Sequence, residues 1–333
     1  MSYFLNKIFS KNILRLQENF LILLCRKNSI IMIGKEFNNI EEYNKSMAKD
    51  IVMNDKLFFL NEIEQDEKFG LIVDFGCADG TLISKLYNRN KSYLYIGYDA
   101  SKEMIDLAKT KFEYPDARNV TFTDDWNEVQ SVLVDLCINS GKKKGKVLLI
   151  LSSVIHEVYS YAKSEDEIKE FWQRTLNSSL FDYITIRDMM PSEDIDRISD
   201  LKITKNYAVL SELRNKIYNG VRSDLNDNPT KESISYKEML KEFEDIWGSI
   251  ANNKNLVHFL LKYKWIINWD REVHENYFPF YIEEMNSRIK LSNYNTIYFK
   301  RFCPLKESVK KTFDIDMVDD THVKYILKLK NNI

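Results

Sequence analysis

Apolar and polar positions follow two rhythms along the chain. Between residues 71 and 186, short apolar runs alternate with longer segments whose apolar residues recur at helical spacing. The short runs predict strands at 71–75, 93–98, 119–123, 147–151 and 183–186. The longer segments predict helices at 81–87, 102–112, 126–137 and 165–176. Because single helices separate successive strands, we expect right-handed βαβ crossovers and a mostly parallel, doubly wound sheet.

The rhythm changes after Pro191, where the segment 192–277 predicts helices and no strand of comparable strength. These helices are expected at 195–203, 207–218, 236–246 and 256–267. Alternation then returns and predicts a helix at 281–289 and strands at 296–302 and 322–329. The last two strands can pair as a hairpin at the sheet edge. The expected fold class is α/β, with a sheet of seven strands and a helical insertion after strand five.

Composition narrows the class of protein. The 333 residues include 48 Lys and Arg against 50 Asp and Glu, a net charge of −2, and 44% are hydrophobic. These values exclude general disorder, and the near-neutral charge argues against tight non-specific binding to nucleic acid or acidic membranes. Four scattered cysteines without a CxxC pair fit a reducing compartment. No apolar run predicts a membrane span or a secretory signal, so a cytoplasmic location is expected.

The sharpest motif follows the first strand, where Asp74 precedes a turn built on Gly76 and Gly80. Glycine allows such a turn and the close approach of a ligand to the backbone. The spacing matches neither G-x-G-x-x-G nor G-x-x-x-x-G-K-[ST]. Two carboxylates, Asp74 and Asp79, also lie in this loop and would repel the negative charge of a phosphate group. The loop therefore favours a cationic or zwitterionic ligand.

Acidic residues also end the next two strands. Asp99 follows the second strand, where a carboxylate can accept two hydrogen bonds from the hydroxyls of a ribose. Asp124, Asp125 and Trp126 follow the third strand, and an acceptor beside an aromatic ring suits adenine. Acids at three successive strand ends predict a nucleoside site at the carboxyl edge of the sheet.

The segment 74–80, with Asp99 and the acids at 124–125, resembles the class I S-adenosylmethionine-dependent methyltransferases. The resemblance covers less than half of the chain, from the helix before residue 71 to the fifth strand at 186, and can extend to the last two strands. It implies a Rossmann-like sheet of seven strands, the last antiparallel, with S-adenosyl-L-methionine as the cofactor. The chain departs from the family pattern at Ala78, which stands in place of the middle glycine of the loop.

The resemblance also implies where the cofactor lies. The glycine loop would contact its methionine part, Asp99 its ribose, and Asp124 or Asp125 its adenine. The expected cofactor-binding residues are Asp74, Gly76, Cys77, Ala78, Gly80, Asp99, Ala100, Met104, Asp124, Asp125, Trp126, Ser152 and Ser153.

The fourth strand ends at Ser152, and the region after it faces the methyl group in this family. His156 can act as a base on the acceptor, and Glu157 can orient it or take that role itself. The alternative for His156 is a purely structural hydrogen bond. Further candidates for acceptor binding are Tyr159, Arg187, Asp188, Trp269 and Tyr277. No metal site is expected, because the pair at 274–275 lacks the H-E-x-x-H spacing.

The expected organisation has four parts. These are a leader or accessory helix at 1–31, a cofactor-binding core at 32–191, a helical substrate cap at 192–277, and a C-terminal part at 278–333 that completes the sheet. The expected activity is methyl transfer to a small or medium-sized acceptor through an oxygen or nitrogen nucleophile. An RNA or tRNA methyltransferase, or a non-catalytic S-adenosylmethionine-binding subunit, is the alternative. The Asn/Asp-Pro-Pro-Tyr/Phe and Pro-Cys motifs of DNA methyltransferases are absent.

Overall fold

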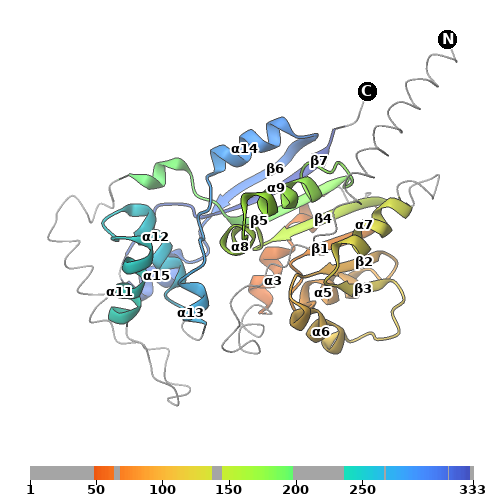
Figure 1. Cartoon of the computed structure of the whole chain (residues 1–333), viewed down its shortest axis with the longest axis horizontal. Coiled ribbons are helices and arrows are strands. Elements are labelled where there is room, and N and C mark those ends of the chain that lie inside the picture. Colours follow the sequence, from red (N-terminus) through yellow and green to blue (C-terminus); the bar gives the residue numbers. More distant parts are fainter. Residues whose placement is uncertain are drawn as a thin grey trace, which may run out of the picture. The chain divides into compact units, whose positions relative to one another are not determined.

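A computed structural model describes residues 49–63, 68–136, 145–197, 236–265, 268–313 and 315–330 (Figure 1). The leader at 1–31, the expected helix at 207–218 and most of that at 195–203 lie outside these ranges. Among the described residues, none of the helices combines the length and apolar character needed to cross a bilayer.

One sheet of seven strands organises the described residues, in the order β3-β2-β1-β4-β5-β7-β6. The strands are β1 (Phe69–Phe75), β2 (Leu94–Tyr98), β3 (Val120–Thr123), β4 (Lys146–Ser152), β5 (Tyr183–Met189), β6 (Tyr294–Phe302) and β7 (His322–Leu329). The strands β1 to β5 are parallel to one another, while β7 is antiparallel to both β5 and β6. The predicted Rossmann-like fold of seven strands, with an antiparallel last strand, is confirmed.

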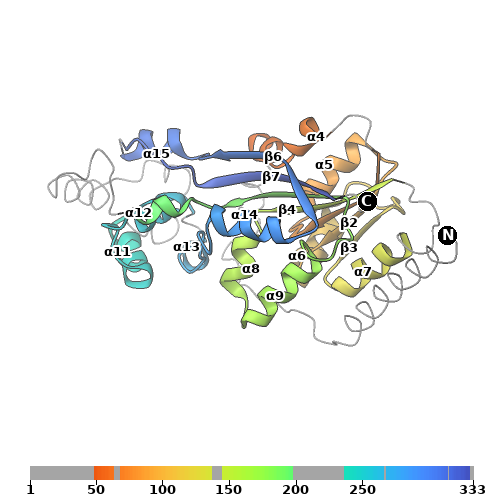
Figure 2. The same cartoon turned by 90° about the horizontal axis from the view of Figure 1, so that it is seen from above.

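Helices cover both faces of this sheet, as Figure 2 shows for α4 and α5 on one side and α7, α8 and α9 on the other. The helices before the insertion are α3 (Asp50–Lys56), α4 (Phe59–Glu62), α5 (Thr81–Arg89), α6 (Lys102–Lys111), α7 (Trp126–Val134), α8 (Ile155–Tyr161) and α9 (Glu165–Arg174). The later ones are η2 (Glu193–Asp196), α11 (Tyr236–Trp247), α12 (Asn253–Lys262), α13 (Trp269–Glu272), α14 (Ile282–Leu291) and α15 (Lys306–Phe313).

The two faces of the sheet have separate apolar cores. Ile72 of β1 packs with residues of α3, α5 and α6, whereas Val73 packs with residues of α7, α8 and α9. Because side chains alternate along a strand, Arg187 and Asp188 at the end of β5 also point to opposite faces. The two neighbours therefore serve different parts of the site described below.

A third apolar cluster lies beyond the end of β5 and is built mainly from α11, α12, α13 and α15 (Figure 1). Met189, the last residue of β5, belongs to it, as do Val309 and Phe313 of α15. The sequence pattern gave a loop between the last two strands, where the structure has α15. It also placed a helix at 256–267, whereas α12 starts at Asn253 after its Asn252 cap and ends at Lys262.

Candidate active site

The glycine loop after β1 has a left-handed backbone at three of its residues. The φ angles are +77° at Gly76, +46° at Ala78 and +75° at Gly80. A Cβ on Gly80 would lie 2.7 Å from the ring of Phe122, so both the backbone and the packing require glycine there. Ala78 keeps the left-handed conformation although it departs from the family pattern, at a cost of about 1–2 kcal/mol.

Asp99 ties this loop to the neighbouring strand end. Its Oδ2 accepts a hydrogen bond from the N–H of Ala78 at 2.9 Å, and its Oδ1 accepts one from Ser101 at 2.9 Å. Ser101 in turn caps α6 by accepting from the N–H of Met104. Burial raises the pKa of Asp99, and the two backbone donors oppose that rise. Asp99, the residue predicted to bind the ribose, thus also fixes the shape of the loop.

Asp74 is the most deeply buried acid of the cofactor region, with 2% of its surface exposed. Burial raises its pKa to about 7, the positive charge of Lys56 opposes this rise, and the negative charge of Asp99 adds to it. Lys56, the last residue of α3, has its own pKa lowered by burial and by Arg187. Sequence reasoning did not find Lys56, because it lies before the motif and carries no pattern.

The three candidate residues that follow β3 lie in different environments. Asp124 is exposed, whereas Asp125 caps α7 by accepting from the backbone N–H and side-chain amide of Asn127. Trp126 is buried, and its Nε1 has no hydrogen-bond partner among the described residues, as is also true of Ser152 Oγ at the end of β4. Two orphaned buried polar atoms beside the carboxyl edge fit a site that takes a polar ligand such as S-adenosylmethionine.

The end of β4 is joined to β5 and to α3. Ser153 has a φ of +57°, its N–H donates to the carbonyl of Arg187 at 2.7 Å, and its Oγ accepts from Arg187 Nη1 at 2.9 Å. Arg187 Nε also pairs with Asp55 of α3 at 2.6 Å, and Lys324 of β7 donates to the same carboxylate. Arg187 therefore holds a loop and a helix in place, and its expected role in acceptor binding stays a prediction.

His156 is held from the opposite face of β5. Its Nδ1 lies 2.7 Å from Asp188 Oδ1, and only 4% of the residue is exposed. Asp188 Oδ2 accepts from the N–H groups of Val154 and Ile155, at 3.0 and 2.6 Å. The carboxylate thus fixes both the start of α8 and the orientation of the imidazole, which turns Nε2 toward Glu275.

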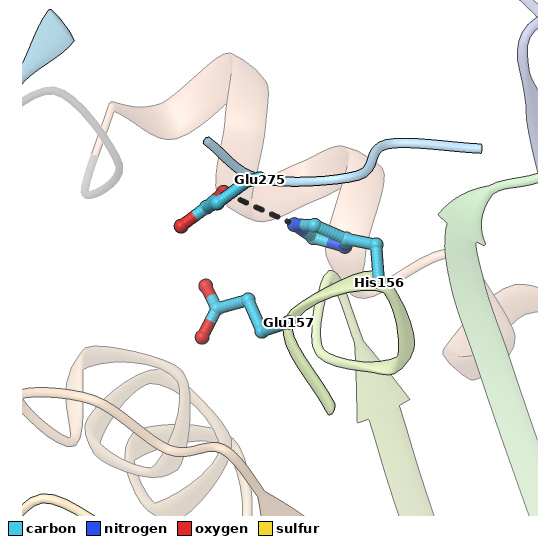
Figure 3. A group of neighbouring side chains, drawn as sticks. All are labelled: His156, Glu157 and Glu275. Atoms are coloured by element: carbon cyan, nitrogen blue, oxygen red, sulfur yellow. Dashed lines mark ion pairs between the residues drawn. The ribbon is translucent and has the colours of Figure 1, made fainter. Parts of the chain in front are cut away.

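Glu275, just after α13, meets His156 from the insertion (Figure 3). Its Oε2 lies 3.8 Å from His156 Nε2, while its Oε1 accepts from Arg271 Nε and Tyr161 Oη, each at 2.7 Å. Arg271 Nη2 also lies 3.4 Å from Glu157 Oε2. One guanidinium therefore bridges two carboxylates that come from distant parts of the chain.

These contacts change the protonation of the group. Burial lowers the pKa of His156, but the charge and hydrogen bond of Asp188 and the charges of Glu275 and Glu157 outweigh it and raise the value to about 9. Burial raises the pKa of Glu157 to about 7, which Arg271 opposes. Burial likewise acts against the ionised form of Glu275, but Arg271 and His156 hold its pKa below the usual value.

The remaining acceptor candidates differ in their position. The Tyr277 ring packs edge-on against His156, with 5.4 Å between ring centroids. Trp269 is buried in the third apolar cluster and donates to Glu242 of α11 at 2.7 Å. Tyr159 packs on Phe280 and accepts from Trp172. Of these three aromatic candidates, Tyr277 is the one in ring contact with His156.

The sequence did not indicate Arg271 or Glu275 as site residues. Both come from the run 265–279, which is dense in aromatic and charged residues and lies at the end of the segment expected to form the substrate cap. Lys262 of α12 holds this run in place. Its ammonium donates to the main-chain oxygens of Glu272 and Glu275 and lies 3.8 Å from the ring centre of Tyr277. A buried lysine among apolar helix residues is the signal that could have pointed to this network.

Comparison with known proteins gives partial matches. No family model matches the chain. A tRNA (guanine-N(7)-)-methyltransferase from Prochlorococcus marinus (strain MIT 9515) is 26% identical over 84 residues, which are 25% of this chain and 40% of that protein. The chain therefore spans less than half the length of the curated relatives it matches.

Solved structures are similar at low identity. The methyltransferase domain of bacterial CtHen1-C has a TM-score of 0.40 and 11% identity, covering 84% of this chain and 97% of that one. The plantazolicin methyltransferase BpumL, in complex with a pentazolic desmethylPZN analog and SAH, has a TM-score of 0.41 and 11% identity, covering 88% and 90%. The sheet of seven strands with an antiparallel last strand is the fold that the resemblance to class I S-adenosylmethionine-dependent methyltransferases implies, and the matched stretch of the curated relatives also belongs to methyltransferases.

Proposed function

We propose that this chain transfers a methyl group from S-adenosylmethionine to an oxygen or nitrogen atom of a small or medium-sized acceptor, by in-line displacement. The observation that carries the proposal is the meeting of two groups at the carboxyl edge of one sheet. The glycine loop with Asp74 and Asp99 lies at the ends of β1 and β2, and the cluster around His156 follows the end of β4. Open α/β sheets bind their ligands at this edge.

The cofactor, when bound, supplies a methyl group on a positively charged sulfur. The residues of the chain suit that charge, because Asp74 and Asp79 lie on the loop that would surround its methionine part. Asp99 keeps lone pairs on both oxygens for the ribose hydroxyls, and Asp124 is the exposed acid free of a capping role. Ser152 offers a buried hydroxyl that has no partner within the described ranges of the chain.

The cluster after β4 suits the acceptor. Asp188 is hydrogen-bonded to His156 Nδ1, and the Nε2 atom faces Glu275, so the imidazole is held from both sides. Glu157 is the more open carboxylate, with 30% of its side chain exposed, and Arg271 keeps it oriented. We assign it the acceptance of the proton that the nucleophile loses. The negative charges of the carboxylates disfavour an anionic acceptor. Because the cluster is buried, an acceptor small enough to enter the site is favoured.

A tRNA acceptor is the second candidate, because the sequence match is to tRNA methyltransferases. The two acceptor classes separate in one assay. Methyl-labelled S-adenosylmethionine is incubated with the full chain and either a low-molecular-weight cell extract or total tRNA. The proposal expects label in extract compounds and none in tRNA. Label in tRNA would establish the second candidate.

Variants make the assay specific. Glu157→Gln should lower transfer by a factor in the roughly 10²–10⁴ range of general-base catalysis while cofactor binding stays intact. Glu284→Gln, an exposed carboxylate of α14, is the matched control and should behave as wild type. Cofactor binding without transfer to either acceptor would refute the proposed activity and favour a non-catalytic subunit.

A further inference from the structure

We infer that His156, Glu157 and Glu275 form a binding site for one divalent transition-metal cation. One donor atom from each of these residues, the imidazole nitrogen and two carboxylate oxygens, lies within 4.8 Å of the other two. Figure 3 shows the carboxylates of Glu157 and Glu275 near the ring of His156. The inference rests on the proposed function and deepens it, because it assigns a metal to the acceptor end of the same site, with one oxygen of Glu157 as a ligand and the other left to accept the proton.

The strongest observation is that His156 is prepared as a ligand. Its side chain is 95% buried, Nδ1 is bonded to Asp188, and Nε2 makes no hydrogen bond with the described residues. A carboxylate on the distal nitrogen is the usual support of a metal-bound histidine, since it fixes the ring and leaves the other nitrogen for the metal. Nε2 is directed at Glu275 Oε2, at 3.8 Å.

Glu275 has the same kind of support. Arg271 and Tyr161 both donate to its Oε1, so its Oε2 is the oxygen that faces His156. Ligating carboxylates are commonly held through their second oxygen in this way. Both donors therefore have their orientation set by neighbouring residues.

The spacing and charge also fit a cation. Donors at about 2.0–2.2 Å from a metal lie about 3–4 Å apart, so a small side-chain movement of Glu157 would complete the group. The carboxylates of Asp188, Glu157 and Glu275 lie around the imidazole, with Arg271 and the ammonium of Lys262 beside them. A divalent cation bound at Nε2 would take the place of a proton on that nitrogen and would be attracted by the carboxylates.

The donor set indicates the class of metal. One imidazole with two carboxylates suits Mn²⁺, Fe²⁺, Co²⁺ or Zn²⁺ better than Ca²⁺ or Mg²⁺, which prefer oxygen alone. Three protein ligands leave coordination positions open, as in catalytic metal sites. A cation there would bind the acceptor hydroxyl or amine and make it easier to deprotonate. The sequence could not indicate this site, because its ligands are brought together only by the fold.

Metal binding can be measured without cofactor or acceptor, so its failure is distinguishable from failure of the proposed function. The full chain, stripped with EDTA, is titrated with Mn²⁺ while free Mn²⁺ is followed by electron paramagnetic resonance. We expect one bound Mn²⁺ per chain. Glu275→Gln and His156→Ala should each weaken binding at least tenfold, and Asp188→Asn should weaken it about 10–100-fold through the orientation of His156.

Glu284→Gln is the control variant and should bind Mn²⁺ as wild type does. Because His156→Ala could disturb folding, circular dichroism is recorded for every variant, and Glu157→Gln provides a nearly isosteric test of the same site. The absence of stoichiometric Mn²⁺ binding, or equal binding by folded Glu275→Gln and Glu157→Gln, would overturn the inference. S-adenosylmethionine binding measured on the same samples would show whether the cofactor site survives independently.

Discussion

At the scale of single residues, the candidate site depends on buried carboxylates that differ in their partners. Asp99 accepts two backbone hydrogen bonds, and Asp188 holds both a helix start and a histidine. Asp74 is buried beside the charges of Lys56 and Asp99. The ionisation of Asp74 is therefore costly in the free protein, and a cationic ligand would relieve that cost.

Asp74→Asn tests this cost through the pH dependence of stability. The pKa of Asp74 is about 7 in the folded chain against 3.8 for the ordinary group, so the folded state binds more protons between these values. The contribution of Asp74 to the free energy of unfolding of wild type therefore falls as pH rises through this window. At pH 8 the variant should be more stable by up to about 4 kcal/mol, with little difference near pH 4.

The measurement is urea denaturation at several pH values between 4 and 8. Asp124→Asn, at an exposed acid on the same edge of the sheet, should keep the wild-type pH profile. If Asp74→Asn and wild type lose stability in parallel as pH rises, Asp74 does not have the raised pKa.

At the scale of elements, the strands and the local motif could be predicted, and several contacts could not. Parallel strands buried on both faces give continuous apolar runs, so β1 to β5 stand out in the sequence. The turn at Gly76 and Gly80 was also evident, because glycine is scarce and clustered there. The short helices α8 and α15 were missed, since one follows a strand directly and the other lies between two strands.

The acceptor half of the site was less predictable for a physical reason. His156 and Glu157 stand next to a strand end and were found, whereas Glu275 approaches His156 only through tertiary packing, as Lys56 approaches Asp74 in the cofactor half. Such contacts leave no periodic trace in the sequence.

Substitutions at two glycines, Gly80 in the cofactor loop and Gly248 after α11, separate the cost of backbone strain from the cost of overpacking. Gly80 and Gly248 both have positive φ, but a Cβ at Gly80 meets Phe122 at 2.7 Å, and one at Gly248 meets nothing closer than 3.4 Å. Gly248→Ala should cost about 1–2 kcal/mol of stability from backbone strain. Gly80→Ala should cost about 1–3 kcal/mol more from overpacking. Equal losses in thermal denaturation would show that Phe122 does not restrict position 80.

The docking of α3 depends on Asp55, whose carboxylate pairs with Arg187 of β5 and Lys324 of β7. Asp55→Ala leaves two buried cations without their partner, so the helix should open more often. Hydrogen exchange followed by mass spectrometry should show faster exchange in residues 50–56, with β1 and β4 unchanged. Asp106→Ala, on the exposed face of α6, is the control. Unchanged exchange in α3 would mean that apolar packing alone holds the helix.

At the scale of the whole chain, the described residues contain two cores on the sheet and a third cluster beyond the end of β5. The division at residues 192–277 as a substrate cap stays a prediction. The third cluster includes α15, from the part expected to complete the sheet, so the insertion and the C-terminal part share one apolar interior. Glu275 reaches His156 from beside this cluster.

Phe313→Ala tests that sharing. Phe313 of α15 is buried against Tyr263, with 4.8 Å between ring centroids. Its truncation should cost about 3–5 kcal/mol in chemical denaturation. Cofactor affinity should stay at the wild-type value, because Phe313 belongs to the third cluster and Asp99 lies at the end of β2. Phe299→Ala, on exposed β6, should change little. A loss of stability no larger than that of Phe299→Ala would separate α15 from the insertion.

The central claim is that the carboxyl edge of this sheet binds S-adenosylmethionine through the loop held by Asp99. Isothermal titration of the full chain with S-adenosylmethionine and its demethylated product tests it most directly. Wild type and Asp106→Ala should bind with equal affinity. Asp99→Ala, shown to be folded by circular dichroism, should bind about 1.5–3 kcal/mol more weakly, because charged hydrogen bonds to the ribose are lost. No binding by wild type, or undiminished binding by Asp99→Ala, would contradict the account.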